Sequence, residues 1–389
     1  MPTVPELRIG VVAGATSTDA VALDARDRLL GSVRVAAGPD TARTAAAAVA
    51  KLVDDAALHP AHVRAVTLGT GYEMDDIVAS QRVRRVAVVR IGAPLTLAVP
   101  PLATWPPRLR RQVSAGEIVV GGGAEYDGGS MTPLDEDALA RFLACVADRA
   151  AGVAITAVFS PVAPEHELVA AAVARRELGC AVHVSLSHEI STVGLLEREN
   201  ATVLNAALRG TATQLAGALR AALAEQRLDA ELYFAQNDGT IMSADHALRY
   251  PALMIAGGPG ISMRGAAHLS GVGDAVVLDV GGTSAAVGVL VNGAPRERST
   301  ATDIAGVRTS LRLPDVARVP FGSGSTIAHD GEGPTLGPGS VGLRLTEEAL
   351  AFGGSTPTLT DAAVAAGRAR VGTVALGAAQ RRELQPALA

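Results

Sequence analysis

The stretch AVVLDVGGTSAAVGVLVNG, residues 275–293, places two apolar runs on either side of a turn made of small residues. This pattern predicts two antiparallel strands joined as a hairpin. The paired Gly281 and Gly282 let the backbone approach an anionic group without a Cβ clash, so that N–H groups can point at phosphate oxygens. Thr283 adds a hydroxyl donor, and Asp279 at the strand end is placed to hold a hydrated Mg²⁺. The stretch is therefore predicted to be a phosphate loop, while a tight turn with an exposed aspartate explains this motif alone equally well.

The pattern recurs near the N-terminus in RIGVVAGATSTDAVALD, residues 8–24, again between two apolar runs. Gly14 occupies the position of Gly281, and Thr16 and Thr18 add hydroxyl groups. A motif that occurs twice indicates two related halves. We therefore expect two lobes, each with one phosphate loop, and one nucleotide between them.

The first loop differs from the second at two positions. Val12 stands where the second loop has Asp279, and Ala15 stands where it has Gly282. The first loop therefore lacks a carboxylate at the strand end and one of the two glycines. Asp19 follows on the other side of the predicted hairpin, and its spacing leaves open whether it replaces the missing carboxylate.

Two further glycine-rich segments are candidate parts of the same site. Gly257 and Gly258 lie between an apolar run and a predicted helix, and the N-terminus of a helix binds anions readily. Gly322, Gly324 and Ser325 belong to a small-residue loop against which a base or ribose can pack. A flexible surface turn explains this second segment equally well.

Composition limits the class of protein. The 389 residues are 48% hydrophobic and 19% charged, which predicts a globular chain with a substantial core. The net charge of −5 and the scattered arginines argue against nucleic acid as a partner. We expect no membrane span and no export signal. Cys145 and Cys180 lie in apolar segments, which predicts reduced core thiols and a cytoplasmic protein.

Strands and helices alternate along much of the chain, which predicts an α/β fold with a partly parallel sheet. We expect an N-terminal lobe with the first phosphate loop at residues 1–92, followed by an irregular edge rich in proline and glycine at 93–133. A middle α/β segment is predicted for 134–230, the C-terminal lobe with the second phosphate loop for 231–377, and a polar tail for 378–389.

Two histidines are weaker candidates for chemistry. His166 and His188 lie beside Glu165, Glu167 and Glu189, a combination that can bind a metal ion. Solvation of polar side chains at the start of a helix explains them better. We therefore predict no zinc site there.

The order of these motifs from Arg8 to Gly372 resembles the A-type subunit of hydantoinases, oxoprolinases and related carboxylases. Besides the two hairpins, the resemblance depends on FSPVAPEHE (159–167), HVSLSHEIS (183–191), TVLNAAL (202–208), YFAQNDGTIMSADHALRYPALMIAGGPGI (233–261), VPFGSGSTIA (319–328) and TPTLTDA (356–362). The chain departs from the family at residues 68–73, where LGTGYE replaces the usual His-Gly-Thr-Thr run.

The resemblance implies the two-lobed actin-like ATPase fold, which is ribonuclease H-like, and an ATP-dependent reaction in which an amide or carboxylate oxygen is phosphorylated and then displaced. It implies catalytic roles for Asp279, as the Mg²⁺ ligand, and for Asp19. The leading hypothesis is hydrolysis of a cyclic amide such as a hydantoin, a lactam or 5-oxoproline. A second B-type subunit or further copies of the chain are the implied partners.

Two other functions stay open at this point. Val12 and the altered segment at 68–73 favour a nucleotide-binding sensor that has lost turnover. A subunit of an ATP-dependent carboxylase has the same motifs, and would require a partner chain, a ketone and bicarbonate. Binding of ATP without turnover would indicate the sensor, and hydrolysis that depends on ketone and bicarbonate would indicate the carboxylase.

Overall fold

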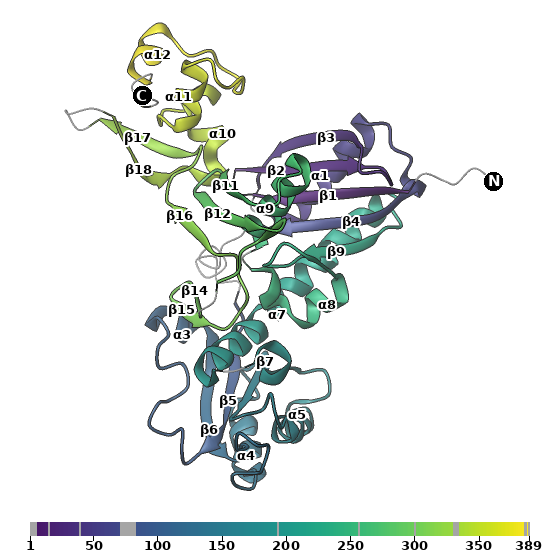
Figure 1. Ribbon diagram of the computed structural model, residues 1–389, viewed down its shortest axis with the longest axis vertical. Coiled ribbons are helices and arrows are strands. Elements are labelled where there is room, and N and C mark those ends of the chain that lie inside the picture. Colours follow the sequence, from purple (N-terminus) through teal and green to yellow (C-terminus); the bar gives the residue numbers. More distant parts are fainter. Residues whose placement is uncertain are drawn as a thin grey trace.

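The structure is a computed structural model that describes residues 6–14, 16–38, 40–70, 83–192, 194–255, 257–298, 301–329, 334–384 and 387. Ala15 and residues 71–73 of the altered segment at 68–73 lie outside these ranges. Three arms extend from a junction that contains helices α7 (Leu195–Glu225) and α9 (Gly257–Ser270) (Figure 1). They are the N-terminal lobe, a middle domain and the C-terminal lobe.

The N-terminal lobe contains a six-stranded sheet in the order β10-β9-β4-β1-β2-β3. Its strands are β1 (Leu7–Ala13), β2 (Ser17–Leu23), β3 (Leu29–Ala36), β4 (Val63–Thr70), β9 (Glu231–Ala235) and β10 (Ile241–Ser243). The first three form an antiparallel meander that contains the first predicted hairpin, and β4 pairs with β1 in parallel. Since β9 pairs with β4, the sheet also takes in the segment from 231, which the sequence assigned to the C-terminal lobe.

One face of this sheet is the core of the lobe. Side chains alternate along β1, so that Ile9 and Val11 are buried while Val12 is exposed. Helix α1 (Thr41–Asp55) covers this face and begins at Asp40, whose carboxylate accepts a hydrogen bond from the Arg43 amide. The C-terminal half of α7 packs against α1 and contributes to the same core. This packing fixes the β1–β2 hairpin as a rigid element.

The middle domain contains a parallel sheet in the order β6-β5-β7-β8. Its elements are β5 (Val86–Ala93), β6 (Ser114–Gly121), β7 (Gly152–Ala157), β8 (His183–Leu186), α3 (Pro107–Val113), α4 (Glu136–Val146), α5 (Glu165–Leu178) and α6 (Ser187–Ile190). Both faces of β5 and β7 are buried, as expected for parallel strands between helices.

Two expectations for this region were wrong. The segment 93–133 is not wholly irregular, because it contains α3 and β6 between its prolines and glycines. Both cysteines are free, but they are exposed. The buried stripe of α4 runs through Leu139, Leu143 and Val146, so Cys145 faces away from the core. Cys180 follows the end of α5.

A buried ion pair joins the middle sheet to α7. The Arg90 Nε and Nη2 atoms donate to the two carboxylate oxygens of Glu199 at 2.6 and 2.7 Å, and both side chains are 1% exposed. Loss of one partner of such a pair costs about 3–5 kcal/mol because the other charge stays buried. The pair therefore holds the middle domain in a defined position relative to the lobes.

The C-terminal lobe contains the predicted second hairpin, formed by β11 (Ala275–Val280) and β12 (Ala285–Val291). Strands β13 (Ala294–Pro295) and β16 (Val316–Val319) both pair with β12. Helix α9 packs against β11, β12 and β13, and also against β4 of the N-terminal lobe. Helix α9 is therefore shared by the two lobes.

The remaining elements are distributed over the three parts of the molecule. They are η1 (Pro60–His62), α8 (Ala244–Arg249), η2 (Pro251–Met254), β14 (Thr302–Ile304), β15 (Val307–Thr309), β17 (Ser325–His329), β18 (Pro334–Ser340), η3 (Gly342–Arg344), α10 (Leu345–Glu348), η4 (Leu350–Phe352), α11 (Leu359–Ala365) and α12 (Ala378–Leu384). The motif TPTLTDA forms the capping box of α11 through Thr358 and Asp361. The predicted polar tail contains α12, whose Leu384 is buried.

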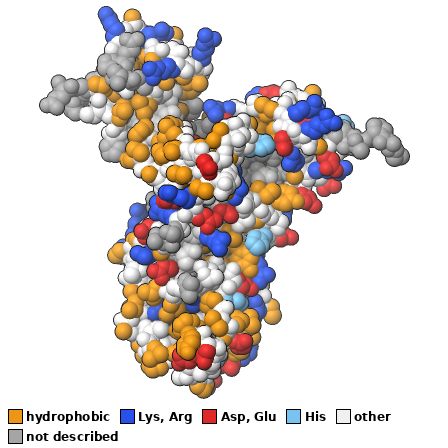
Figure 2. Space-filling view, viewed as in Figure 1, with side chains coloured by type: hydrophobic (Ala, Val, Ile, Leu, Met, Phe, Trp, Pro, Cys, Tyr) orange, Lys and Arg blue, Asp and Glu red, His pale blue; other side chains and the backbone are white. Residues whose placement is uncertain are grey.

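One face of the sheet in the C-terminal lobe is not covered by any described element. Val276, Leu278 and Val280 of β11 are 71%, 63% and 56% exposed, on the face opposite α9. Figure 2 shows hydrophobic side chains gathered over β11, β12 and β16. Across the residues that the structure describes, no helix combines the length and the apolar character that crossing a membrane requires.

Candidate functional site

The two predicted phosphate loops close in the same way. The Gly14 amide donates to the Ser17 carbonyl at 2.9 Å, and the Gly281 amide donates to the Ser284 carbonyl at the same distance. Each hairpin therefore ends in a four-residue turn that begins with glycine and ends with serine. The motif that is repeated in the sequence therefore forms the same kind of turn in both copies.

The two turns meet across a cleft between the lobes. A Cβ atom built on Gly282 would lie 2.3 Å from Thr16 Cγ2, so the backbone of one turn touches the side chain of the other. The cleft has a volume of about 460 Å³. Its walls include eight of the residues that the sequence predicted, namely Gly14, Thr16, Asp19, Gly258, Asp279, Gly281, Gly282 and Thr283. The backbone N–H groups of Gly282 and Thr283 have no partner among the described residues, so they are available to an anion.

The two lobes present the same pair of charges, with the arginine on the third strand of the row in both and the acid on different strands. In the N-terminal lobe Val12, Asp19 and Arg34 lie opposite one another on β1, β2 and β3. In the C-terminal lobe the corresponding row on β11, β12 and β16 is Asp279, Ala286 and Arg318. Residues directly opposite in a sheet point to the same face, and all six line the cleft. The missing acid at position 12 is thus present one strand further along, as Asp19.

Asp19 and Arg34 form an ion pair, with 2.5 Å between the Arg34 Nε and Asp19 Oδ1 atoms. The Arg34 side chain is 74% exposed, so the pair adds little to stability. A planar guanidinium suits recognition of phosphate. The sequence analysis missed Arg34 and Arg318, because strand register places them at the cleft.

Helix α9 provides the third wall. It begins at Gly257, so the glycines form the first turn of the helix and not a loop before it. Gly258, Pro259 and Ser262 line the cleft, whereas Gly257 is buried. The unpaired N–H groups at the N-terminus of a helix carry partial positive charge and favour an anion. The sequence analysis therefore assigned these glycines to a loop, whereas they belong to the helix, and only Gly258 of the two lines the cleft.

The segment 322–325 lies behind the second turn. The Ser323 and Gly324 amides donate to the Gly281 and Gly282 carbonyls at 3.0 and 2.7 Å. Of this segment only Ser323 is among the residues lining the cleft, while Ser325 Oγ accepts a hydrogen bond from the Gly322 amide. These residues hold the turn in place. Thr18, also predicted for the site, is 1% exposed on β2 and does not line the cleft.

The donor set of the cleft fits a magnesium ion bound mainly through phosphate. Within the described ranges, no group of three or more His, Cys, Asp or Glu side chains forms a metal site. Mg²⁺ typically uses one or two carboxylates together with phosphate oxygens and water. Asp279, half-buried at the end of β11, can provide that single carboxylate.

Two lobes with duplicated hairpin loops around a polar cleft are the arrangement that the actin-like ATPase fold predicts. The family models that match the chain are the hydantoinase/oxoprolinase N-terminal region at residues 8–178 and hydantoinase/oxoprolinase at 198–388. The chain belongs to the hydantoinase/oxoprolinase family.

Known proteins with similar sequences are subunits of larger enzymes. Caprolactamase subunit alpha from Pseudomonas jessenii is 26% identical over 98% of this chain and 57% of its own length. Acetophenone carboxylase gamma subunit from Aromatoleum aromaticum is 29% identical over 62% of this chain and 34% of its own length. The chain therefore spans about a third to just over half of these relatives.

Solved structures share the fold. The nucleotide-free structure of acetone carboxylase matches with a TM-score of 0.72 at 19% identity, over 98% of this chain and 58% of that chain. The ATP-dependent caprolactamase from Pseudomonas jessenii matches with a TM-score of 0.69 at 23% identity, over 96% of this chain and 56% of that chain. The predicted fold class is confirmed.

Proposed function

We propose that the chain binds ATP between its two hairpin turns and acts in the ATP-dependent hydrolysis of a cyclic amide. The observation that carries the proposal is the contact of Gly282 with Thr16 at a cleft lined by both turns. An amide is a poor electrophile, and a phosphoryl group on its oxygen makes that oxygen a leaving group. Overall, the cyclic amide, ATP and two water molecules give the ring-opened amino acid, ADP and phosphate.

In this proposal, different residues of the cleft hold the phosphates, balance their charge and hold the metal ion. The amides of Gly282 and Thr283 and the first turn of α9 hold the phosphate chain, while Arg34 and Arg318 balance its charge. Asp279 would hold Mg²⁺, which would neutralise charge that develops on the phosphate oxygens. Asp19 keeps Arg34 oriented toward the cleft. Catalysis in this arrangement depends on positioning and electrostatics.

Calorimetry with ATP and ADP in the presence of Mg²⁺ tests the binding step. Release of phosphate in the presence of lactams, hydantoins and 5-oxoproline tests the reaction. We expect binding in the first experiment and turnover with one class of cyclic amide in the second. Absence of nucleotide binding would refute the proposal, and binding without turnover would assign the chain to the sensor function.

A carboxylase subunit is the second candidate, and the similarity to acetophenone carboxylase favours it. It uses the same activation of a carbonyl or carboxylate oxygen, followed by attack of a carbon nucleophile. Phosphate release that requires both a ketone and bicarbonate would select it over the hydrolase.

We place the partner of this chain on the uncovered face of the C-terminal lobe. In the N-terminal lobe β1 has β2 on one side and β4 on the other, whereas the corresponding β11 pairs only with β12 among the described strands. A free strand edge beside exposed Val276, Leu278 and Val280 fits a polypeptide that adds a parallel strand and an apolar helix. The occupant is a B-type subunit, since the relatives are themselves subunits.

Replacing Leu278 with arginine is expected to prevent assembly with a B-type subunit, because it puts a charge in the centre of the apolar face. The measurement is light scattering of the mixed chains, combined with hydrogen exchange of residues 275–280, which should slow in the complex. Leu269→Arg is the control, since Leu269 is 87% exposed but lies on α9, away from this face. Equal assembly of the two variants, or no complex with the natural chain, would contradict the assignment.

A further inference from the structure

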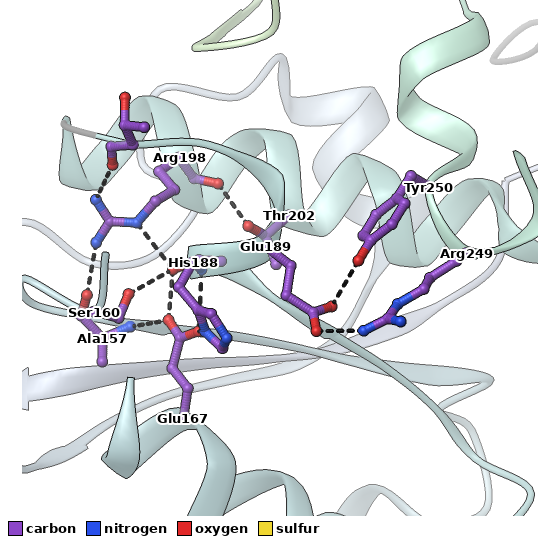
Figure 3. Close-up of polar contacts among 11 residues, drawn as sticks. Ala157, Ser160, Glu167, His188, Glu189, Arg198, Thr202, Arg249 and Tyr250 are labelled. Atoms are coloured by element: carbon purple, nitrogen blue, oxygen red, sulfur yellow. Dashed lines mark hydrogen bonds and ion pairs between the residues drawn. The ribbon is translucent and has the colours of Figure 1, made fainter. Parts of the chain in front are cut away.

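A second polar cluster lies in the middle domain, remote in sequence from the phosphate loops. Glu167 of α5 is fully buried and accepts hydrogen bonds from the Ala157 amide at 2.8 Å, from His188 Nδ1 at 2.6 Å and from the Ser187 hydroxyl. Figure 3 shows these groups converging on the carboxylate. Burial would raise the pKa of Glu167, but the hydrogen bonds from His188 and Ser187 outweigh it and lower the pKa. The lowered pKa favours the ionised form of Glu167, and both of its carboxylate oxygens accept hydrogen bonds.

Arg198 of α7 makes the cluster rigid. Its Nε atom donates to the Ser187 hydroxyl at 2.9 Å, and its terminal nitrogens donate to the carbonyl oxygens of Thr192 and Ala157 at 2.8 and 2.7 Å. Every side chain behind His188 is thus held in place (Figure 3). A histidine positioned in this way has a fixed ring orientation.

His188 has one ring nitrogen left for a ligand. The hydrogen bond from Nδ1 to Glu167 raises the pKa of His188 against the opposing effect of burial. Among the described residues, Nε2 has no hydrogen-bond partner. The side chain is 19% exposed and lines a cleft of about 360 Å³. That cleft shares no lining residue with the nucleotide cleft.

The opposite wall of the cleft offers two more donors. The Ser310 hydroxyl oxygen is buried without a hydrogen-bond partner in the part of the chain that the structure describes, and a buried polar group of this kind normally has one. Arg312 follows two residues later, is exposed and lines the same cleft. The lining of the cleft therefore includes a neutral donor and a positive charge besides His188.

The acids at the rim of this cleft already have partners. Glu189 accepts hydrogen bonds from Arg249 at 2.5 Å and from the Tyr250 hydroxyl at 3.3 Å. Asp238 accepts from the amide and the hydroxyl of Thr240 at 2.9 and 2.6 Å. Both carboxylates at the rim are therefore engaged by donors of the protein itself.

We propose that this cleft is a second ligand site, which binds a small carboxylate through His188 Nε2, the Ser310 hydroxyl and the Arg312 guanidinium. Two cationic groups and one hydroxyl match the charge and the acceptor oxygens of a carboxylate. The buried Glu167 holds the ring of His188 through Nδ1, so it acts as a positioning residue. The site does not depend on nucleotide binding, and its test needs no ATP.

Histidine-labelled protein in an NMR titration tests the proposal, with the His188 signals assigned from the spectrum of His188→Gln. Acetate and 6-aminohexanoate are the probes. We expect a saturable shift of the His188 signals and a rise of about one unit in its pKa, since an adjacent negative charge favours the imidazolium form. Signals that do not move, or that move without saturation, would overturn the proposal.

Substitutions of Arg312 and Ser310 test whether these two side chains contribute to carboxylate binding. Arg312→Gln and Ser310→Ala are each expected to weaken carboxylate binding about 10-fold, as loss of a charged hydrogen bond does. Arg308→Gln is the matched control, because Arg308 pairs with Glu197 at 3.3 Å and does not line this cleft. Binding that survives Arg312→Gln unchanged, or that falls equally with Arg308→Gln, would also overturn the site.

Discussion

Replacing Gly282 with valine is expected to lower ATP affinity by about 10²-fold or more, because separated turns lose hydrogen bonds to charged phosphate oxygens worth about 1.5–3 kcal/mol each. A Cβ atom at this position would lie 2.3 Å from Thr16 Cγ2 and 2.8 Å from Thr16 Cβ. Rotation of the threonine moves Cγ2 but not Cβ, so the two turns must separate. The measurement is calorimetry with ATP and Mg²⁺, together with a melting curve to show that the protein is folded.

A compensating substitution distinguishes separation of the turns from general damage. Gly282→Ala alone should weaken binding, and Gly282→Ala combined with Thr16→Gly should restore it, because the second change removes every atom that clashes. Gly265→Ala in α9 is the control, since a Cβ atom there meets nothing within 4 Å. If Gly282→Val binds ATP as the natural protein does, the phosphate chain does not lie between these turns.

The hairpins could be predicted from the sequence because their signal is local. Apolar runs around paired glycines determine strand, turn and strand within about twenty residues, and the duplication at Gly14 and Gly281 pointed to a site between two halves. The same duplication also predicted that the two turns face each other across the site. Only the structure shows that Gly282 packs on Thr16.

The charges of the cleft could not be predicted, because they depend on strand register. Asp19 lies opposite Val12, and Arg34 lies opposite Asp19, through pairings that loops of different length set. The same holds for Arg318, which reaches the row of Asp279 through β12. Motif spacing left the role of Asp19 open for this reason.

The cluster around Glu167 was missed for a different reason. The sequence analysis interpreted His166 and His188 from their neighbours in the chain, where helix-start solvation is the ordinary explanation. The tertiary fold instead brings His188 onto Glu167, and His166 Nδ1 accepts a hydrogen bond from the Gly123 amide at 2.9 Å. The local sequence pattern does not indicate a contact between α5 and α6. Only the packing of the folded chain brings these residues together.

Replacing Asp279 with asparagine is expected to lower the turnover rate about 10³-fold, because a metal that stabilises charge on phosphate contributes several kcal/mol to the transition state. The amide keeps the size of the side chain and removes the charge that would hold Mg²⁺. Nucleotide affinity should fall less than turnover, since the backbone amides and the first turn of α9 still contact the phosphates. Phosphate release measured across a range of Mg²⁺ concentrations should show a requirement for more Mg²⁺.

Asp274→Asn is the matched control for this prediction. Asp274 lies just before β11, at the end of the strand away from the cleft, and its Oδ1 atom accepts the Asn292 amide at 2.9 Å, which an asparagine oxygen can also do. Both substitutions remove one negative charge from the same strand region, so a general effect of net charge would appear in both. A loss of turnover with Asp279→Asn but not with Asp274→Asn would assign the Asp279 carboxylate to the metal. Equal and small effects of the two substitutions would instead leave Asp19 as the acid of the cleft and place the metal on the N-terminal lobe.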